Sequence, residues 1–243
     1  MTTLARRALV TGASGSIGAA IARRLARSGF QIYLHAHRSG ERIEALAQEL
    51  NAARECAQLL RFDVTDGASV HSALELVLEA GPIQVLVNNA GIHDDAVFPG
   101  MSAHQWRRVI DVTLNGFYNV THPLLMPMIR TRWGRIVNIS SVAALTGNRG
   151  QVNYAAAKGA LNSATRALAI ELASRGVTVN AVAPGIIRSE MSEGHFDTAT
   201  IERLVPMQRA GEAGEVASLV DFLCSDSAAY ITGQVVSING GMI

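Results

Sequence analysis

The segment ALVTGASGSIG (residues 8–18) joins a short apolar run to a helical pattern through a loop rich in glycine. In residues 17–27, Ile17, Ile21 and Leu25 share one stripe and arginines occupy the opposite face, as in an amphipathic helix. Glycines between a strand and a helix allow a tight turn and let backbone N–H groups approach a pyrophosphate. The segment therefore predicts a strand–loop–helix unit that binds a nucleotide.

The same alternation of apolar runs and helical periods continues along the rest of the chain. Strand-like runs lie at residues 8–10, 31–36, 59–62, 85–87, 135–139, 178–182 and 235–238, and helical periods lie at residues 17–27, 41–53, 68–78, 105–129, 154–173 and 213–223. Most of the strand-like runs are almost continuously apolar, as in strands covered on both faces. Pro123 and Pro127 are expected to bend or end the helix at 105–129. The sequence predicts an α/β fold, a single-domain Rossmann-like doubly wound structure with a seven-stranded parallel sheet and helices on both faces.

The composition argues against several classes of function. The formal net charge is +1 and acidic and basic residues are mixed, so we expect neither nucleic-acid binding nor membrane binding through a polybasic tail. No run reaches the roughly 20 apolar residues of a membrane span, and the first residues do not resemble a secretory signal. Neither the cysteines, Cys56 and Cys224, nor the histidines show metal-ligand spacing. We expect a cytoplasmic protein without a metal site.

The end of the second predicted strand bears on the identity of the nucleotide. In Rossmann sites for NAD, an acidic residue about 20 residues after the glycine loop binds the ribose hydroxyl. Residues 35–39 read HAHRS and contain no carboxylate. Arg38 offers several donors to a 2′-phosphate, which a carboxylate would repel. This pattern favours NADPH, and the alternative interpretation of Arg38 is a solvated loop arginine.

Tyr154 and Lys158 stand four residues apart and so share one face of a predicted helix. Such a pair is common by itself, but here Ser141 follows a predicted strand upstream. Reduction of a carbonyl group places charge on its oxygen, and a proton donor beside that oxygen lowers the barrier. The pKa of a free tyrosine is about 10, and an ammonium group one helical turn away is expected to lower it. Ser141 can hydrogen-bond the same oxygen.

Together these motifs resemble the short-chain dehydrogenase/reductase family, and the resemblance covers essentially the whole chain. The family's loop pattern, Thr-Gly-x-x-x-Gly-x-Gly, matches residues 11–18 except that Ser16 replaces the middle glycine and Gly15 stands one residue earlier. We expect Gly15 to absorb the strain of the turn and Ser16 to face the phosphates or solvent. By resemblance, the catalytic residues are Asn115, Ser141, Tyr154 and Lys158. The resemblance implies that Lys158 also holds the nicotinamide ribose and that Asn115 supports a water chain that resupplies the proton.

The resemblance further assigns cofactor and substrate contacts within one domain. The implied cofactor residues are Gly12, Ser14, Gly15, Ser16, Ile17, Gly18, Arg38, Asp63, Val64, Asn89, Ala90, Gly91, Tyr154, Lys158, Pro184, Gly185, Ile187 and Ser189. Residues 1–100 are expected to form the nucleotide-binding part and residues 101–243 the catalytic part, with a substrate lid at 190–210. The suggested substrate contacts are Gln151, Met191 and Phe196. Ser140 could be mistaken for the catalytic serine, but Ser141 directly precedes Val142, as in the family.

Within the family, several segments are most similar to β-ketoacyl-acyl-carrier-protein reductases. These segments are residues 8–14, 134–142, 153–158, 230–234 and 239–242. The similarity implies reduction of a 3-oxoacyl thioester, carried on acyl carrier protein, in fatty-acid or polyketide-type synthesis. Departures from the usual pattern at Gly15, Ser16 and Gln208 suit a second, specialised copy that acts on a polyketide or pigment chain.

The same resemblance suggests the partners of the chain. The arginines that dock the acidic carrier protein fall on Arg132 and Arg175, and Arg130, Arg132 and Arg135 are expected to form a basic surface cluster. Family members are usually homotetramers, which pair the helices at 105–129 and 154–173 across one axis and the last strand across another. A homotetramer is therefore expected here.

Two other functions remain open from the sequence. One is reduction or oxidation of a free small alcohol, sugar, ketone or steroid by the same residues beneath a differently shaped lid. The other is a sensor that binds NADP without turnover. A sensor has no need of Ser141 and Tyr154 together, so the enzyme interpretation is favoured.

Overall fold

A computed structural model describes residues 5–38, 40–188 and 197–243 of the chain. Within these residues, seven strands form one parallel sheet in the order β3-β2-β1-β4-β5-β6-β7. The strands are β1 (Arg7–Val10), β2 (Gln31–Ala36), β3 (Ala57–Arg61), β4 (Val85–Asn88), β5 (Gly134–Ile139), β6 (Val177–Pro184) and β7 (Val235–Ile238). The order reverses between β1 and β4, and open α/β sheets bind ligands beyond the carboxyl ends of their strands at such a point. The predicted fold class is confirmed.

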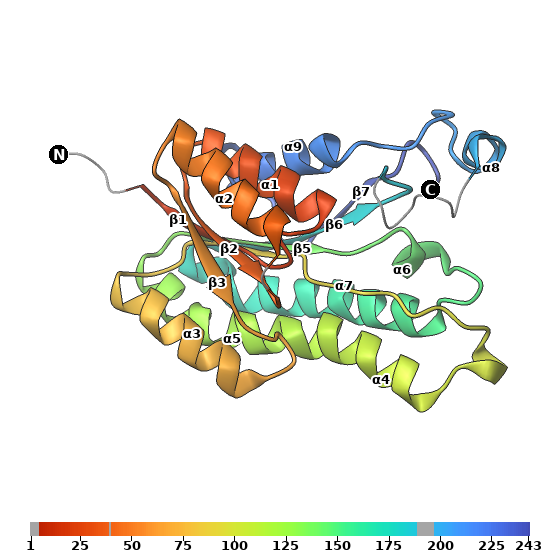
Figure 1. Cartoon of the computed structure of the whole chain (residues 1–243), viewed down its shortest axis with the longest axis horizontal. Coiled ribbons are helices and arrows are strands. Elements are labelled where there is room, and N and C mark those ends of the chain that lie inside the picture. The colour runs from red at the N-terminus through yellow and green to blue at the C-terminus, as the bar shows by residue number, and fades with distance from the viewer. Residues whose placement is uncertain (1–4, 39, 189–196) are drawn as a thin grey trace.

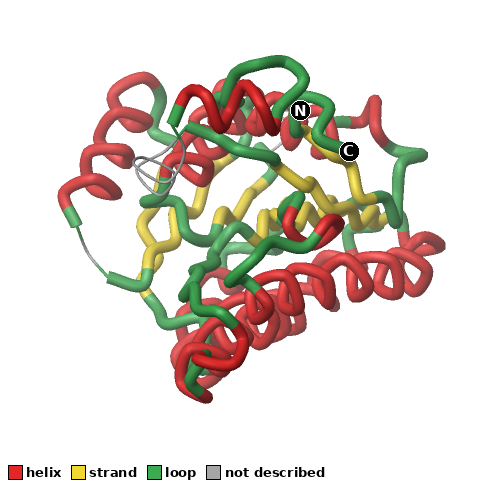
Figure 2. The backbone as a smooth tube through the Cα atoms, turned by 90° about the vertical axis from the view of Figure 1, so that its right-hand side faces the viewer, coloured by secondary structure: helices red, strands yellow, loops and turns green. Residues whose placement is uncertain are grey.

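Helices cover both faces of this sheet, with α1, α2 and α9 on one face and α3, α5 and α7 on the other (Figure 1). The helices are α1 (Ser16–Arg27), α2 (Glu41–Ala53), α3 (Gly67–Glu79), α4 (Ala103–Ile110), α5 (Gly116–Arg130), α6 (Ala143–Thr146), α7 (Val152–Leu172), α8 (Thr198–Leu204) and α9 (Ala213–Cys224). Loops predominate at the end where the strands finish, which faces the viewer in Figure 2. Across the described ranges, every helix is too short or too polar to traverse a bilayer.

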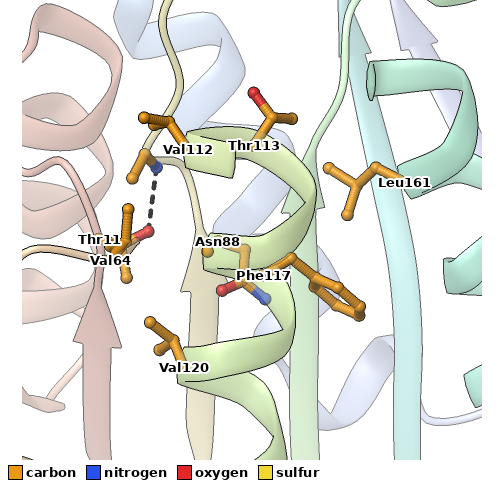
Figure 3. Close-up of a pocket in the computed structure, with 10 residues that line it drawn as sticks. Thr11, Val64, Asn88, Val112, Thr113, Phe117, Val120 and Leu161 are labelled. Atoms are coloured by element: carbon orange, nitrogen blue, oxygen red, sulfur yellow. Dashed lines mark hydrogen bonds between the residues drawn. The ribbon is translucent and has the colours of Figure 1, made fainter. Parts of the chain in front are cut away.

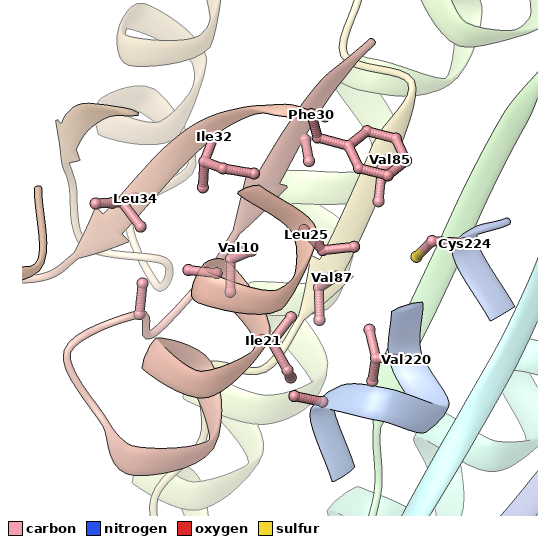
Figure 4. Packing of buried hydrophobic residues seen from close by; sticks show 14 of the residues in the cluster. Val10, Ile21, Leu25, Phe30, Ile32, Leu34, Val85, Val87, Val220 and Cys224 are labelled. Carbon is pink, nitrogen blue, oxygen red and sulfur yellow. The ribbon is translucent and has the colours of Figure 1, made fainter. Parts of the chain in front are cut away.

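The core consists of two apolar layers, one on each face of the sheet. On one face Val10 packs with Ile21 of α1 and Val220 of α9, as Figure 4 shows. On the other face Leu9 packs with Leu124 of α5. Successive residues of a strand point to opposite faces, so a strand covered on both sides is apolar at every position. This explains the continuous apolar runs of the sequence.

A buried chain of polar side chains fixes α5 and α7 to the middle of the sheet. Nδ2 of Asn88 donates to Oγ1 of Thr121 at 3.0 Å and to Oδ1 of Asn138 at 2.9 Å. Nδ2 of Asn138 donates in turn to Oγ1 of Thr165 on α7 at 2.8 Å. Polar networks buried in a low-dielectric core specify one arrangement when their members are satisfied. This network therefore sets the position of α7, the helix that carries Tyr154 and Lys158.

The long helix predicted at 105–129 differs from the structure. A π-helical turn, Asp111–Asn115, separates α4 from α5, and α5 continues through Pro123 and Pro127 to Arg130. The prolines do not end the helix because Val120, Leu124 and Met128 bury its inner face completely, and tertiary packing outweighs the missing hydrogen bonds. The short helices α6 and α8 were not predicted.

Candidate active site

Two glycines of the loop between β1 and α1 are required by its geometry. Gly12 has a φ of +64°, in the left-handed region. A Cβ on Gly18 would lie 2.4 Å from the carbonyl oxygen of Gly12 and 2.7 Å from Nδ2 of Asn89, closer than real contacts. Gly15 instead has an ordinary φ of −80°, so the expectation that it absorbs the strain of the turn is wrong. Ser16 is the first residue of α1, where helical geometry accepts any L-residue, and it is exposed as expected.

The N-terminus of α1 is open to an anion. Its N-cap, Gly15, provides no side chain to cap the helix, and Ser14 and Ser16 are exposed on either side. The first N–H groups of a helix lack partners within the helix and carry partial positive charge. The loop therefore fits the pyrophosphate of a dinucleotide, and Gly12, Ser14, Gly15, Ser16, Ile17 and Gly18 are the residues that would hold it.

His35, a residue without a predicted role, anchors this loop from β2. Its Nδ1 accepts a hydrogen bond from the N–H of Gly12 at 3.2 Å, and its Nε2 donates to the carbonyl of Phe62 at 2.9 Å. The imidazole also stacks on the Phe62 ring with the centroids 3.9 Å apart. Burial lowers the pKa of His35 to about 4, so the ring is neutral. The only sequence signal for this contact is a histidine inside an apolar strand.

The residues after β4 join the loop to the catalytic lysine. Oγ1 of Thr11 accepts from the backbone N–H of Asn89 at 2.9 Å and of Ala90 at 3.0 Å. Nδ2 of Asn89 donates to two carbonyl groups of the loop, at 2.9 and 3.0 Å. A Cβ on Gly91 would lie 3.2 Å from Nζ of Lys158. The structure thus brings the predicted cofactor residues 89–91 beside both the loop and Lys158.

The predicted adenosine contacts lie at the ends of β2 and β3. Arg38 is exposed and makes no hydrogen bond or ion pair with the other described residues. Oδ1 of Asp63 accepts from the N–H and hydroxyl of Thr65, at 2.9 and 2.8 Å, and Oδ2 lies 3.6 Å from Nε2 of His37. Burial raises the pKa of Asp63. These neighbours together lower it by more, so the net shift is downward. Val64 is buried.

Ser141, Tyr154 and Lys158 meet beyond the carboxyl end of β5. Ser141 hydrogen-bonds the Tyr154 phenol, and Nζ of Lys158 lies 5.8 Å from the centroid of the Tyr154 ring. Lys158 is buried and donates to the carbonyl of Ile139 at 2.6 Å. The hydroxyl of Ser140 is directed instead at the backbone carbonyl of Lys158, at 3.5 Å. The serine that faces the phenol is therefore Ser141.

The ionisation of this pair differs from the sequence expectation. Burial raises the pKa of Tyr154, Ser141 lowers it through its hydrogen bond, and Asp95 raises it through its charge; the net shift is upward. Complete burial lowers the pKa of Lys158 to about 8. The expected net fall of the tyrosine pKa is wrong for this structure, because desolvation of the phenol outweighs the ammonium. The phenol is protonated at neutral pH.

Asn115 lies on the outside of its helix, which does not fit the role predicted for it. It is exposed, and its Nδ2 donates to Oδ1 of Asp111 at 2.7 Å. Thr113 points inward instead, and its Oγ1 is buried without a hydrogen-bond partner. Thr113 lines a cavity of about 10 Å³ together with Asn88 and with Leu161 of α7 (Figure 3), a space close to one water molecule. The π-helical turn holds more residues than an α-helical turn and so changes which residue faces α7.

The structure describes only some of the predicted site residues that follow β6. The carbonyl of Pro184 accepts from the N–H of Val142 at 2.8 Å, which ties this segment to the loop of Ser141. A Cβ on Gly185 would lie 2.8 Å from Cα of Asn239, and Ile187 is buried. Ser189, Met191 and Phe196 lie outside the described residues. The described part of the predicted lid contains α8.

The predicted docking arginines lie at the opposite end of the molecule from the phenol. Arg132 precedes β5, Arg175 follows α7, and both are exposed. Arg135 does not belong to a surface cluster, because it is 2% exposed and donates to the carbonyl groups of Gly134 and Ser225. The prediction of a three-arginine surface cluster is therefore wrong. An inward-facing arginine in a strand carries no distinguishing sequence signal.

The described residues contain no group of three or more histidine, cysteine, aspartate or glutamate side chains suited to a metal ion. The functional groups at the carboxyl ends of the strands are thus the anion-binding loop, the phenol, the serine hydroxyl and the buried ammonium. This set can bind a dinucleotide and deliver a proton to an oxygen atom.

Known proteins are similar in sequence to nearly the whole chain. A family model described as Enoyl-(Acyl carrier protein) reductase matches residues 12–243. The chain is 44% identical over 236 residues to a 3-oxoacyl-acyl-carrier-protein reductase of Aggregatibacter actinomycetemcomitans, covering 96% of this chain and 98% of that one. It is 43% identical over 239 residues to the enzyme of the same name from Pseudomonas aeruginosa, covering 97% and 96%. The chain belongs to the short-chain dehydrogenase/reductase family.

Proposed function

We propose that this protein uses NADPH to reduce a 3-oxoacyl thioester, carried on acyl carrier protein, to the 3-hydroxyacyl thioester. The observation that carries the reaction type is the meeting of Ser141, Tyr154 and Lys158 beside a loop that fits a dinucleotide. The substrate class follows the relatives, which align with this chain over almost their full length. The relatives fit fatty-acid synthesis, and the sequence departures at Gly15, Ser16 and Gln208 suit a specialised polyketide-type pathway as the alternative.

Each side chain of the site has a role in moving the proton. NADPH, when bound, supplies the hydride. Tyr154 is protonated at neutral pH and donates its proton to the carbonyl oxygen as that oxygen gains charge. Ser141 hydrogen-bonds the same oxygen and holds it beside the phenol. Lys158, next to Gly91, would bind the ribose of the cofactor, and its charge stabilises the phenolate left after proton transfer.

The preference for NADPH over NADH rests on the end of β2. Arg38 has no partner among the described residues, so its guanidinium is available for a 2′-phosphate. The carboxylate of Asp63 accepts hydrogen bonds from Thr65 and lies 3.6 Å from Nε2 of His37. The surroundings therefore favour an additional phosphate over a ribose hydroxyl that needs a carboxylate.

The position of Arg132 and Arg175 supports an assembly in which a carrier protein docked on one copy reaches the active site of a second copy. α7 has 21 residues and so spans about 30 Å, with Tyr154 in its first turn and Arg175 beyond its last. A carrier protein docked on these arginines would lie far from the phenol of the same chain. The family's homotetramer supplies a second copy, and α5 and α7 each expose large apolar side chains, Tyr118 at 60% and Ile170 at 82%, that a partner could cover.

A comparison of substrates tests this function against reduction of a free small carbonyl compound. The enzyme is mixed with NADPH, and cofactor oxidation is followed with a 3-oxoacyl thioester on carrier protein, with free ketones and with sugars. A preference for the carrier-bound thioester supports the proposal. Turnover only with free carbonyl compounds supports the alternative oxidoreductase, and cofactor binding without any turnover supports the sensor.

A further inference from the structure

Residues 94–96, which follow β4, are fastened along the first turn of α7. The carbonyl of Asp94 accepts from Nδ2 of Asn153 at 2.9 Å, and the N–H of Ala96 donates to the carbonyl of Gly150 at 2.9 Å. Between these contacts, Oδ2 of Asp95 accepts from Nε2 of Gln151 at 2.8 Å. Three hydrogen bonds therefore hold the Asp95 carboxylate beside the start of the helix that carries Tyr154.

This carboxylate lies within electrostatic range of the phenol. Gln151 is the N-cap residue of α7 and Tyr154 lies in the first turn, so the two are near neighbours at the start of this helix. The N-terminus of a helix also favours a negative charge beside it. Burial of the phenol and the charge of Asp95 both raise the pKa of Tyr154.

We propose that Asp95 is a positioning residue whose negative charge keeps Tyr154 protonated and so extends carbonyl reduction to higher pH. The inference rests on the proposed role of Tyr154 as the proton donor. Reduction needs the phenol and oxidation needs the phenolate, because the same oxygen gives up or takes the proton in the two directions. A fixed negative charge near the phenol stabilises the first form relative to the second.

The described charged groups around Tyr154 are few. Lys158 approaches from the same helix, with Nζ 5.8 Å from the ring centroid, and opposes Asp95 by favouring the phenolate. His93 lies on the other side of Asp95, with Nδ1 3.3 Å from Oδ1, and offsets the carboxylate when it is protonated. Ser141, from the loop after β5, is neutral. Asp95 is thus the described negative charge that acts on the phenol.

Asp94 provides a matched control. It neighbours Asp95 in sequence, but its carboxylate accepts from Nε2 of Gln105 at 3.0 Å and pairs with Nη1 of Arg108 at 3.3 Å. Asp94→Asn therefore removes the same charge from the same segment without removing the carboxylate held at Gln151. Asp95→Asn keeps an oxygen that can accept from Gln151 and removes only the charge.

A titration of the phenol tests the inference without any substrate. The absorbance of phenolate near 295 nm is followed against pH for each variant, and the same variant carrying Tyr154→Phe is subtracted. We expect the Tyr154 transition to move to lower pH in Asp95→Asn and to stay unchanged in Asp94→Asn. An unchanged transition in Asp95→Asn, or equal shifts in both variants, would overturn the inference. If Asp95→Asn does not fold by circular dichroism, Asp95→Ser supplies the second neutral variant.

The pH profile of reduction provides the second measurement. We expect the high-pH limb of this profile to move down by about half a pH unit in Asp95→Asn, the roughly threefold change in acid strength for a unit charge about one helical turn away in a mostly aqueous dielectric. Asp94→Asn should leave this limb in place. A shifted titration without turnover of any 3-oxoacyl thioester would refute the proposed function and leave the inference standing. A titration that does not shift, together with normal turnover, would refute the inference and leave the proposed function standing.

Discussion

The two ends of the sheet treat their polar groups in opposite ways. At the amino ends of the strands, Arg135 is buried but donates to two backbone carbonyl groups, stacks on Trp133 and lies 3.5 Å from Asp226. Nε1 of Trp133 donates to the same carboxylate at 2.7 Å, and Arg6 also stacks on that ring, 3.6 Å from its centroid. The charges of Arg6, Arg135 and Asp226 are thus satisfied within the chain.

At the carboxyl ends, several groups are left without protein partners. No side chain caps α1, Arg38 has no partner among the described residues, and Oγ1 of Thr113 is buried without a hydrogen bond. Buried polar groups are almost always satisfied in proteins, so exceptions gather where a ligand or water completes them. The comparison indicates that the open groups at the carboxyl ends suit a ligand, whereas the paired charges around Arg135 stabilise the fold.

The largest expected effect is at the binding end. Tyr154→Phe removes the proton donor and should lower kcat roughly 1000-fold, within the range for loss of general acid catalysis. Stability and NADPH affinity should hardly change, because the hydroxyl is not part of the core network. Steady-state kinetics, a thermal melt and a fluorescence titration with NADPH measure the three quantities. Wild-type turnover in this variant would remove the basis of the mechanism.

His35 is an exception to this comparison. It lies near the carboxyl ends of the strands, but both of its ring nitrogens have hydrogen-bond partners within the protein. Its folded-state pKa of about 4 is below the unfolded value of 6.5, so the unfolded chain takes up the proton first. Its contribution to the free energy of unfolding is complete above pH 6.5 and is lost as the pH falls toward 4, by about 3 kcal/mol.

Denaturant unfolding measured from pH 7 to pH 4 tests this dependence. His35→Gln keeps a donor and an acceptor but does not titrate, so its free energy of unfolding should fall less steeply over the same range. Equal pH dependence in the two proteins would show that other groups control acid unfolding.

A substitution at Arg135 tests the same comparison at the amino ends of the strands. Arg135→Met leaves the carbonyl groups of Gly134 and Ser225 without their donor and should lower the free energy of unfolding by about 2 kcal/mol. The kcat at 25 °C should stay unchanged, the reverse of Tyr154→Phe. Arg6→Met is the control, because Arg6 is partly exposed and its loss should change stability by less than about 0.5 kcal/mol.

A smaller effect is expected at Arg38. If its guanidinium binds the 2′-phosphate, Arg38→Leu should raise the KM for NADPH about tenfold and leave the KM for NADH unchanged. Initial rates with each cofactor at saturating thioester measure both constants. A parallel rise for both cofactors would instead indicate a general loss of adenosine binding.

The smallest effect is expected at the far end of α7. Arg132→Ala should raise the KM for a carrier-bound thioester roughly threefold at low ionic strength, through slower encounter with an acidic partner. The KM for a small thioester without carrier protein should not move. Arg27→Ala, at an exposed arginine of α1, is the control. A rise that persists at high salt would contradict an electrostatic docking role.

Sequence patterns predicted the sheet and the reacting pair but not the details that depend on packing. Apolar runs located the strands because both faces of the sheet are covered. Tyr154 and Lys158 could be paired because four residues make about one turn of a regular helix. Asn115 was assigned by resemblance, and the structure places it on the outside of a π-helical turn whose buried residue is Thr113. The burial of Arg135 and the anchoring by His35 depend on partners distant in sequence.

The π-helical turn also constrains how this helix can change in length. A π-helical turn accommodates one residue more than an α-helical turn, so deleting one residue within Asp111–Asn115 would return the segment to regular geometry and leave α4 and α5 nearly in phase. Gln105, whose carbonyl accepts from Nδ2 of Asn153 at 3.2 Å, would therefore stay beside the start of α7. A one-codon deletion should be tolerated better here than elsewhere in α4 or α5, and gaps in alignments of related enzymes are best placed at this turn.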